Sequence, residues 1–315
     1  MFGTAWVSNA DTGTVTPVDL ATGMAGEPID VDQVPSWLVA APDGRTVYLS
    51  GSGGLTPVDT AQRDAGPIMP IFNCYRVALT PDGERAYATS IANRWVVPFD
   101  LTSRQVGHPI TFTEAPMDIA ITPDGSTAWV VVPLPPHLTP IDLATATRGT
   151  PIPIPLPVQL RAIVLSPNGR TAYVASSNTP ELFPVDLTTR IVGTPITLRG
   201  LPSDVEISPD GLTALVTYGS LNAASIVDLP LGQSGPLITV GEDPQGVTID
   251  RASRVGYVAN NTAAGTITPI DLTTGQAGQA IPAGPFAGDV VLVEPAAPPP
   301  APPAAPTPAS PTFTG

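Results

Sequence analysis

The stretch PNGRTAYVASSNTPELFPVDL, residues 167–187, holds in one place the three short patterns that recur along this chain. A turn of the Pro-Asp-Gly type comes first, a short apolar strand with a central aromatic residue follows, and a second strand ends in Val-Asp-Leu or a close variant. The last pattern occurs seven times, with its aspartates 40, 41, 42, 44, 42 and 43 residues apart. This period suits units of four short strands. The aspartates are Asp19, Asp59, Asp100, Asp142, Asp186, Asp228 and Asp271.

Each unit predicts one antiparallel sheet of four strands, A to D, because no segment has helical periodicity. One such sheet cannot bury both its faces, so neighbouring units must stack, and radial stacking gives a propeller. The chain opens at Ala5–Asn9 with a strand B that lacks its strand A, and the missing strand appears at Gly288–Glu294. We therefore predict an all-β, seven-bladed β-propeller over residues 1–294, closed by pairing a C-terminal strand with the N-terminal strands.

Composition excludes several classes of function. The 315 residues include 13 basic and 27 acidic side chains, for a net charge of −14, which disfavours binding to nucleic acid. All the basic residues are arginine, so catalytic and phosphate-binding lysines are absent. A single cysteine, Cys74, cannot form an internal disulfide, and the two histidines, His108 and His137, cannot form a three-histidine zinc site.

The ends of the chain carry separate expectations. Residues 295–315 contain nine prolines and six alanines, which predicts an extended, disordered tail or linker rather than a second folded domain. No apolar run is long enough to predict membrane insertion, and the first residues do not resemble a signal peptide. We expect a monomer.

Two copies of the central strand, at Ala172–Ser176 and Gly256–Asn260, carry a family resemblance. Each follows a Pro-Asp-Gly type of turn and precedes a Val-Asp-Leu or Ile-Asp-Leu strand, which resembles the YVTN repeat of bacterial seven-bladed propellers, including the YncE-like proteins. The resemblance covers residues 1–294 and implies the propeller fold. It also implies export to the periplasm, the cell surface or the medium, although a cytoplasmic location stays open without a signal peptide. Relatives of similar architecture include lactonase-like hydrolases and a streptogramin lyase.

Strand C departs from that family pattern. Six of its seven copies carry a proline where the family has an apolar residue, and Ile226 is the exception. Proline has no backbone N–H to donate to the hydrogen-bond ladder of a sheet, so we expect a bulge or a shortened ladder at this position. The prolines are Pro17, Pro57, Pro98, Pro140, Pro184 and Pro269.

The repeated aspartates predict turns rather than a site, because the carboxylate in each can accept backbone N–H groups. Function is expected where the repeats differ. Aligned on the turns, one position just before strand A varies around the ring and should surround one mouth of the central channel. Its seven residues are Trp37, Arg76, Asp118, Ala162, Asp204, Gly246 and Asp289. Variable loops are expected to add Tyr75, Arg161, His137 and Tyr218.

Three interpretations of this mouth stay open. The carboxylates of Asp118, Asp204 and Asp289 could bind Ca²⁺ or Mg²⁺, which could polarise an ester or lactone carbonyl. A small molecule or a protein could instead bind to a set of aromatic and cationic residues without chemistry. The mouth could also be a solvated rim in which Arg76 neutralises Asp118. The candidate ligand-binding residues are Trp37, Tyr75, Arg76, Arg161 and Tyr218.

No catalytic sequence signature favours an enzyme, and His137 is only a weak candidate for a general base. We therefore expect a non-enzymatic binding module that presents the variable channel mouth to a small ligand or a protein partner. The alternatives are a metal-assisted hydrolase or lyase at the same mouth, and a structural module displayed on a larger exported protein.

Overall fold

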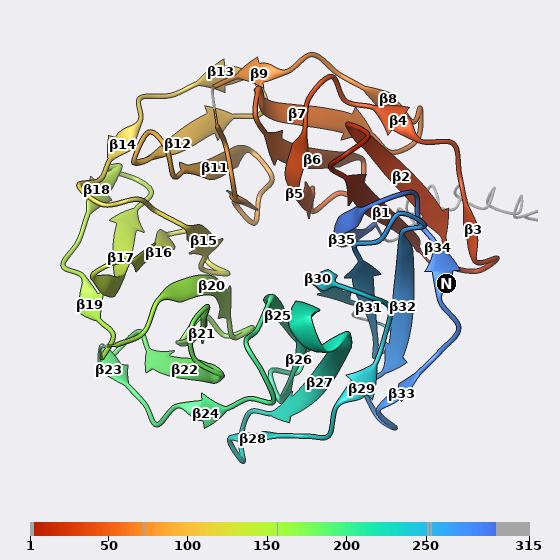
Figure 1. Ribbon diagram of the computed structural model, residues 1–315. Coiled ribbons are helices and arrows are strands. Elements are labelled where there is room, and N and C mark those ends of the chain that lie inside the picture. Colours follow the sequence, from red (N-terminus) through yellow and green to blue (C-terminus); the bar gives the residue numbers. More distant parts are fainter. Residues whose placement is uncertain (1–2, 72, 156, 251, 253, 294–315) are drawn as a thin grey trace, which may run out of the picture.

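The computed structural model describes residues 3–71, 73–155, 157–250, 252 and 254–293, and these residues form seven small sheets arranged as blades around one axis (Figure 1). Their only helical element is the 3₁₀ turn η1 (Gly219–Leu221), and no helix among them is long and apolar enough to cross a membrane. The predicted tail, residues 295–315, and the predicted last strand residue, Glu294, lie outside the described residues.

Each blade has three full strands and an outer strand in two short pieces. The innermost strands A are β35 (Ala287–Val293), β5 (Pro35–Ala40), β10 (Val77–Leu79), β15 (Asp118–Ile121), β20 (Leu160–Leu165), β25 (Asp204–Ile207) and β30 (Pro244–Ile249). The strands B are β1 (Thr4–Asn9), β6 (Thr46–Gly51), β11 (Arg85–Ser90), β16 (Thr127–Pro133), β21 (Thr171–Ser176), β26 (Thr213–Tyr218) and β31 (Val255–Asn260). The strands C are β2 (Thr14–Asp19), β7 (Gly54–Asp59), β12 (Trp95–Asp100), β17 (Pro136–Asp142), β22 (Glu181–Asp186), β27 (Ala223–Asp228) and β32 (Thr266–Asp271).

The outer strand D has two pieces because the chain leaves the ladder between them, and both pieces pair with strand C. In blade order these pieces are β3 (Met24–Ala25) and β4 (Ile29–Asp30), β8 (Asp64–Ala65) and β9 (Met69–Pro70), β13 (Gln105–Val106) and β14 (Ile110–Thr111), β18 (Thr147–Arg148) and β19 (Ile152–Pro153), β23 (Ile191–Val192) and β24 (Ile196–Thr197), β28 (Gln233–Ser234) and β29 (Ile238–Thr239), and β33 (Gln276–Ala277) and β34 (Ile281–Pro282).

The ring closes as the sequence predicts. Strand β35 pairs antiparallel with β1, so one blade, called blade 1, takes its strand A from the C-terminal part of the chain and its other strands from the N-terminal part (Figure 1). Blades 2 to 7 follow in chain order. Closure of this kind leaves no open sheet at the join between the two ends.

The turn aspartates have the structural role that was predicted. Asp19 Oδ1 accepts hydrogen bonds from the backbone N–H groups of Ala21 and Thr22, and the equivalent aspartates of the other blades accept from their own C-to-D turns. In the A-to-B turns the glycine adopts a left-handed conformation, as at Gly83 with φ +71°. These carboxylates are therefore occupied by their own backbone.

The strand-C prolines leave the inner ladder intact, contrary to the expected bulge. Pro17 lies opposite Trp6 in an unbroken β1–β2 register, and no B–C pair of any blade shows a register shift. The carbonyl of Pro17 accepts a hydrogen bond from Gly26 N at 2.7 Å, so this residue's backbone polar groups face the outer strand. The N–H group that proline lacks would also face strand D, where the ladder is already interrupted between the two pieces of that strand. The expected shortening therefore occurs between strands C and D.

A glycine faces each of these prolines across that interruption. A Cβ on Gly107 would lie 2.8 Å from Cγ of Pro98, and the corresponding glycines of the other five proline-bearing blades leave similarly little room. Proline and glycine thus form a matched pair nine residues apart in each of six blades. The remaining blade has Gly235 nine residues after Ile226, and a Cβ there would lie 3.0 Å from the Ile226 carbonyl oxygen, so the close approach of the two strands also favours glycine without a proline.

Replacing Gly107 with alanine should lower the free energy of unfolding by about 1–3 kcal/mol, because the new methyl group must displace the Pro98 ring. The loss should shrink by at least half in a Pro98→Ala background. The exposed Gln105→Ala change in β13 is the control, with an expected effect within about 0.5 kcal/mol. Urea titrations of the four variants measure this, and an equal loss in both backgrounds would contradict the proposed contact.

Neighbouring blades are joined by apolar layers and by hydroxyl groups near the ends of strands B. Ser50 Oγ donates to the carbonyl of Tyr75 in the next blade at 2.6 Å, and Thr217 Oγ1 donates to the carbonyl of Gln245 at 2.7 Å. These bonds hold the segments that lead into strands A. They therefore help to position the mouth of the ring.

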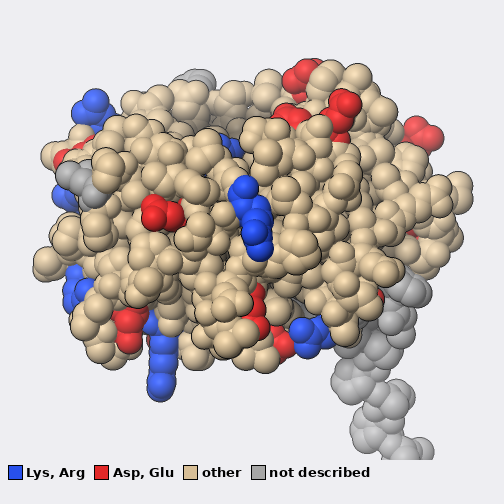
Figure 2. Space-filling view, turned by 60° about the horizontal axis from the view of Figure 1, so that its bottom comes forward, with Lys and Arg blue, Asp and Glu red and all other residues tan. Residues whose placement is uncertain are grey.

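The molecular surface seen in Figure 2 carries few charged side chains, and its blue groups lie apart from one another. No continuous basic area is visible on this face.

Candidate functional site

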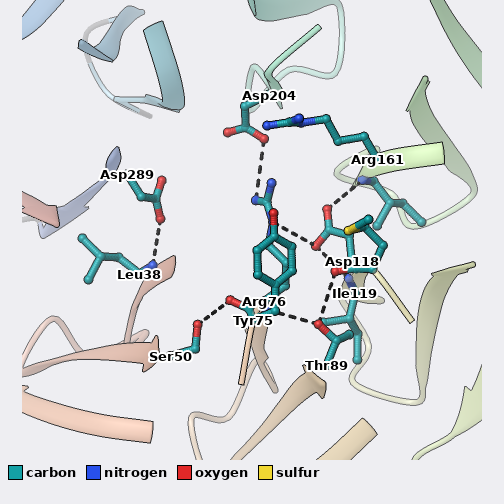
Figure 3. Close-up of polar contacts among 12 residues, drawn as sticks. Leu38, Ser50, Tyr75, Arg76, Thr89, Asp118, Ile119, Arg161, Asp204 and Asp289 are labelled. Atoms are coloured by element: carbon teal, nitrogen blue, oxygen red, sulfur yellow. Dashed lines mark hydrogen bonds and ion pairs between the residues drawn. The ribbon is translucent and has the colours of Figure 1, made fainter. Parts of the chain in front are cut away.

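A buried arginine lies at the centre of the variable ring. Arg76, just before β10, is 4% exposed, and its guanidinium carbon lies 3.2 Å from the centre of the Trp37 ring. The guanidinium forms long ion pairs with Asp118, at 3.9 Å from Nε, and with Asp204, at 3.8 Å from one terminal amino group (Figure 3). Nε of Arg76 is buried without a hydrogen-bond acceptor among the described residues. The expected pairing of Arg76 with Asp118 exists, but the pair is buried rather than solvated.

Each carboxylate of the ring holds the next blade. Asp118 accepts the backbone N–H of Ile163 at 2.9 Å, and Asp204 accepts that of Val247 at 3.2 Å. These bonds join blade 4 to blade 5 and blade 6 to blade 7.

Asp289 makes the equivalent contact between blade 1 and blade 2, accepting the N–H of Leu38 at 2.7 Å (Figure 3). It needs a glycine beside it, because a Cβ on Gly246 would lie 2.4 Å from Asp289 Oδ1. The three aspartates therefore link neighbouring strands A through hydrogen bonds.

Burial raises the pKa of all three carboxyl groups, although Arg76 opposes the rise in each. The pKa of Asp204 reaches about 6. The pKa of Asp289 reaches about 8, because the negative charge of Asp204 adds to the cost of its burial. Asp289 is therefore mostly protonated at neutral pH.

In four blades strand A begins with a β-bulge, and in the other three it begins without one. In blade 5, Leu160 pairs with Ser176 and Ala162 with Ala175, which leaves Arg161 as the extra residue. Ser36 is the extra residue of blade 2. Blades 7 and 1 gain one residue in the same way, at residues 245–246 and 288–289. A bulge redirects a side chain away from the regular pleat, and bulges are common beside functional sites.

The bulges surround one hollow of about 160 Å³ at this mouth. The predicted residues that line it are Trp37, Tyr75, Arg76, Arg161, Asp204 and Gly246. The repeat pattern did not predict the other polar lining residues, which include Ser36, Ser203, Gln245 and Asn261. No periodic signal marks them, because a bulge adds a residue without changing the turn motifs on which the repeats align.

Two predicted residues lie elsewhere. Tyr218 is fully buried in the core, where its hydroxyl is 2.7 Å from that of Ser225. His137 in β17 lies in a different hollow, of about 790 Å³ between the outer parts of blades 3 and 4, together with His108. Its Nδ1 is 2.7 Å from the carbonyl of Pro135. Neither residue lines the channel mouth.

The three ring carboxylates are not assembled as metal ligands. Within the described part of the chain, no group of three or more His, Cys, Asp or Glu side chains could hold a metal ion. Asp118 and Asp289 each accept two backbone N–H groups, from Ile119 and Ile163 and from Leu38 and Val290. Metal binding would have to break these interactions as well as the contacts with Arg76.

Adding Ca²⁺, Mg²⁺ or Mn²⁺ to metal-stripped protein should therefore shift the midpoint of thermal unfolding by no more than about 1 °C, since a ligand stabilises only in proportion to its binding. Differential scanning calorimetry with and without each ion measures this. A clear rise that Asp118→Ala or Asp289→Ala abolishes would contradict the expectation and support the hydrolase or lyase interpretation.

Comparison with known proteins supports the architecture. No family model matches the chain, and no curated protein matches it. The chain is similar to a chain of hydrazine synthase from Kuenenia stuttgartiensis, with a TM-score of 0.76 and 17% identity over 89% of this chain and 92% of that one. It is also similar to a functionally unknown protein from Desulfotomaculum acetoxidans DSM 771, with a TM-score of 0.79 and 14% identity over 93% and 99%. The likeness is one of fold.

Proposed function

We propose that this propeller is a non-enzymatic binding protein whose channel mouth holds a small polar ligand. The observation that carries the proposal is the hollow of about 160 Å³ bordered by the bulges of four blades. Its lining combines two aromatic rings with eight polar or charged residues, so the hollow suits a polar ligand that is held mainly by hydrogen bonds. The propeller fold also suits a binding module, since its rigid strands fix the loops around the mouth.

A blocking substitution tests this proposal. Ser36 is an exposed bulge residue on the border of the hollow, so Ser36→Trp should fill the mouth while leaving the strands in place. We would screen sugars, amino acids, organic acids and nucleosides by thermal unfolding. A ligand at about 100 times its Kd stabilises its protein by about 2.7 kcal/mol, which corresponds to a rise of roughly 5–10 °C in the midpoint.

The expected result is a rise with at least one compound that Ser36→Trp abolishes. Thr102→Trp is the matched control, because Thr102 is exposed in a C-to-D turn on the other face of the ring, and it should leave the rise unchanged. If no compound in the panel raises the midpoint, or if Ser36→Trp leaves every rise intact, the proposed site is wrong.

Membership of the YVTN-repeat family and export from the cell form part of the same proposal. Their support is the Tyr-Val pattern in β21 and β31, at Tyr173 and Tyr257. Fractionation of the native cells with an antibody against the propeller would test export, and recovery of the protein only in the cytoplasm would contradict it. Light scattering would test the proposed monomer.

A further inference from the structure

The charge of the channel mouth differs from that of the whole chain. The chain has a net charge of −14, yet the residues that line the hollow include two arginines, Arg76 and Arg161, and one carboxylate, Asp204. Asp118 and Asp289 do not line it, and both are bound to backbone N–H groups of their own and the next blade. Arg76 already forms ion pairs with Asp118 and Asp204, so Arg161 is the remaining cation of the lining.

Arg161 lines the hollow in a fixed orientation. Its Nε donates to the carbonyl of Ser203 at 2.8 Å, which fixes the plane of the guanidinium. Its guanidinium forms no ion pair with any described carboxylate, although its charge acts to lower the pKa of Asp118. Its terminal amino groups donate no hydrogen bond to the described residues. A guanidinium that is fixed in this way and has unused N–H donors can bind an oxygen anion, which accepts two parallel hydrogen bonds from it.

Arg76 adds a second, independent observation. Its side chain is 5% exposed, lines the hollow and has a buried Nε without an acceptor. Its carboxylate neighbours are 3.8 Å and 3.9 Å away, beyond hydrogen-bond distance. The protein alone therefore leaves donors of both arginines unsatisfied.

The size and the lining of the hollow restrict the class of ligand further. At about 30 Å³ for each water, 160 Å³ holds roughly five waters, so a ligand must be small. Tyr75 offers aromatic surface for an apolar part, whereas the guanidinium of Arg76 already covers one face of Trp37. The negative charge of Asp204 disfavours a dianion such as phosphate beside it. Resting on the proposed function, we infer that the ligand is a small organic monocarboxylate whose carboxylate binds to Arg161, with Arg76 supplying additional positive charge.

Two pairs of isosteric probes test this inference. Benzoate and benzamide, and propionate and propionamide, would be titrated calorimetrically at constant ionic strength and neutral pH. Each acid should bind at least about tenfold more tightly than its amide, because a charge-assisted hydrogen bond to a guanidinium exceeds a neutral one by this order. Arg161→Gln should weaken binding of the acids about 10–100-fold and change binding of the amides less than about twofold.

Arg94→Gln is the matched control, because it removes the same charge from a residue outside the lining, and it should leave all four affinities unchanged. Equal binding of acid and amide, an absence of saturable binding by either acid, or an affinity unaffected by Arg161→Gln would overturn the inference. Binding of inorganic phosphate in place of the acids would overturn it as well. A neutral compound whose binding Ser36→Trp abolishes would leave the proposed site standing without this ligand class.

Discussion

Replacing Arg76 with methionine should lower the free energy of unfolding by about 3–5 kcal/mol, the usual cost of removing one partner from a buried ionic group. Methionine keeps the apolar stem but removes the guanidinium, so Asp118 and Asp204 lose their cation and Trp37 loses its stacked neighbour. At roughly 2–4 °C for each kcal/mol in a domain of this size, the midpoint of thermal unfolding should fall by about 10 °C.

Two further variants make this prediction specific. Arg254→Met is the control, because its ion pair with Asp210 is shorter, at 3.0 Å, but half-exposed, and it should cost no more than about 1 kcal/mol. Adding Asp118→Asn and Asp204→Asn to Arg76→Met should recover most of the loss, since a neutral cluster no longer needs a cation. If Arg76→Met costs no more than Arg254→Met, the buried cluster does not stabilise the ring as described.

The second large effect is a loss of stability as the pH rises. Asp289 has a pKa of about 8 in the folded protein and 3.8 as the reference value, so between these values the folded state holds a proton that the unfolded state has released. Stability must therefore fall with rising pH across this window, by up to about 1.4 kcal/mol for each pH unit. Asp204, with a pKa of about 6, adds to the fall in the lower part of the window.

Asp289→Asn should remove most of this slope above pH 6, because asparagine cannot ionise. Its amide oxygen can still accept the N–H of Leu38 or that of Val290, and the loss of the other bond should cost about 1 kcal/mol at every pH. Urea titrations from pH 5 to 9 would measure the slopes, and the difference between wild type and variant cancels the titration of groups far from Asp289. An unchanged slope would show that Asp289 does not ionise in this range.

The exposed turn aspartates serve as an internal comparison for that experiment. Asp19 and Asp142, for example, accept backbone N–H groups that lower their pKa. They stabilise the fold where they are ionised and titrate on the acid side of the window. Unfolding in acid and the loss of stability toward pH 8 thus arise from two different sets of the same residue type.

The repeat made the architecture predictable from the sequence, whereas the chemistry at the mouth depended on burial. The seven regularly spaced aspartates predicted the blades, and the missing strand A at the N-terminal end predicted the closing pair of β35 and β1. The same alignment predicted that Trp37, Arg76 and the three aspartates share one ring. It could not predict how deeply each side chain lies, because that depends on the neighbouring blade.

Particular residues show where this limit lies. Tyr218 and His137 belong to the repeats in which they were predicted. Tyr218 is nevertheless buried in the core, and His137 lies in the hollow between the outer parts of blades 3 and 4. The strand-C prolines predicted a disturbed ladder, but the side on which it occurs depends on the direction of one carbonyl. A pattern of residue types records which positions are equivalent and does not record which neighbour each side chain meets.

The sequence by itself determined the seven-bladed ring, its closure and its turns, because these follow from local strand and turn preferences repeated at a constant period. Only the tertiary structure decided that the three aspartates hold neighbouring strands, that Arg76 is buried between two of them, and that bulges direct Ser36 and Arg161 toward one hollow. Those features arise where two blades pack against each other. Charge, exposure and pKa at such a contact depend on atoms that are about forty residues apart in the chain.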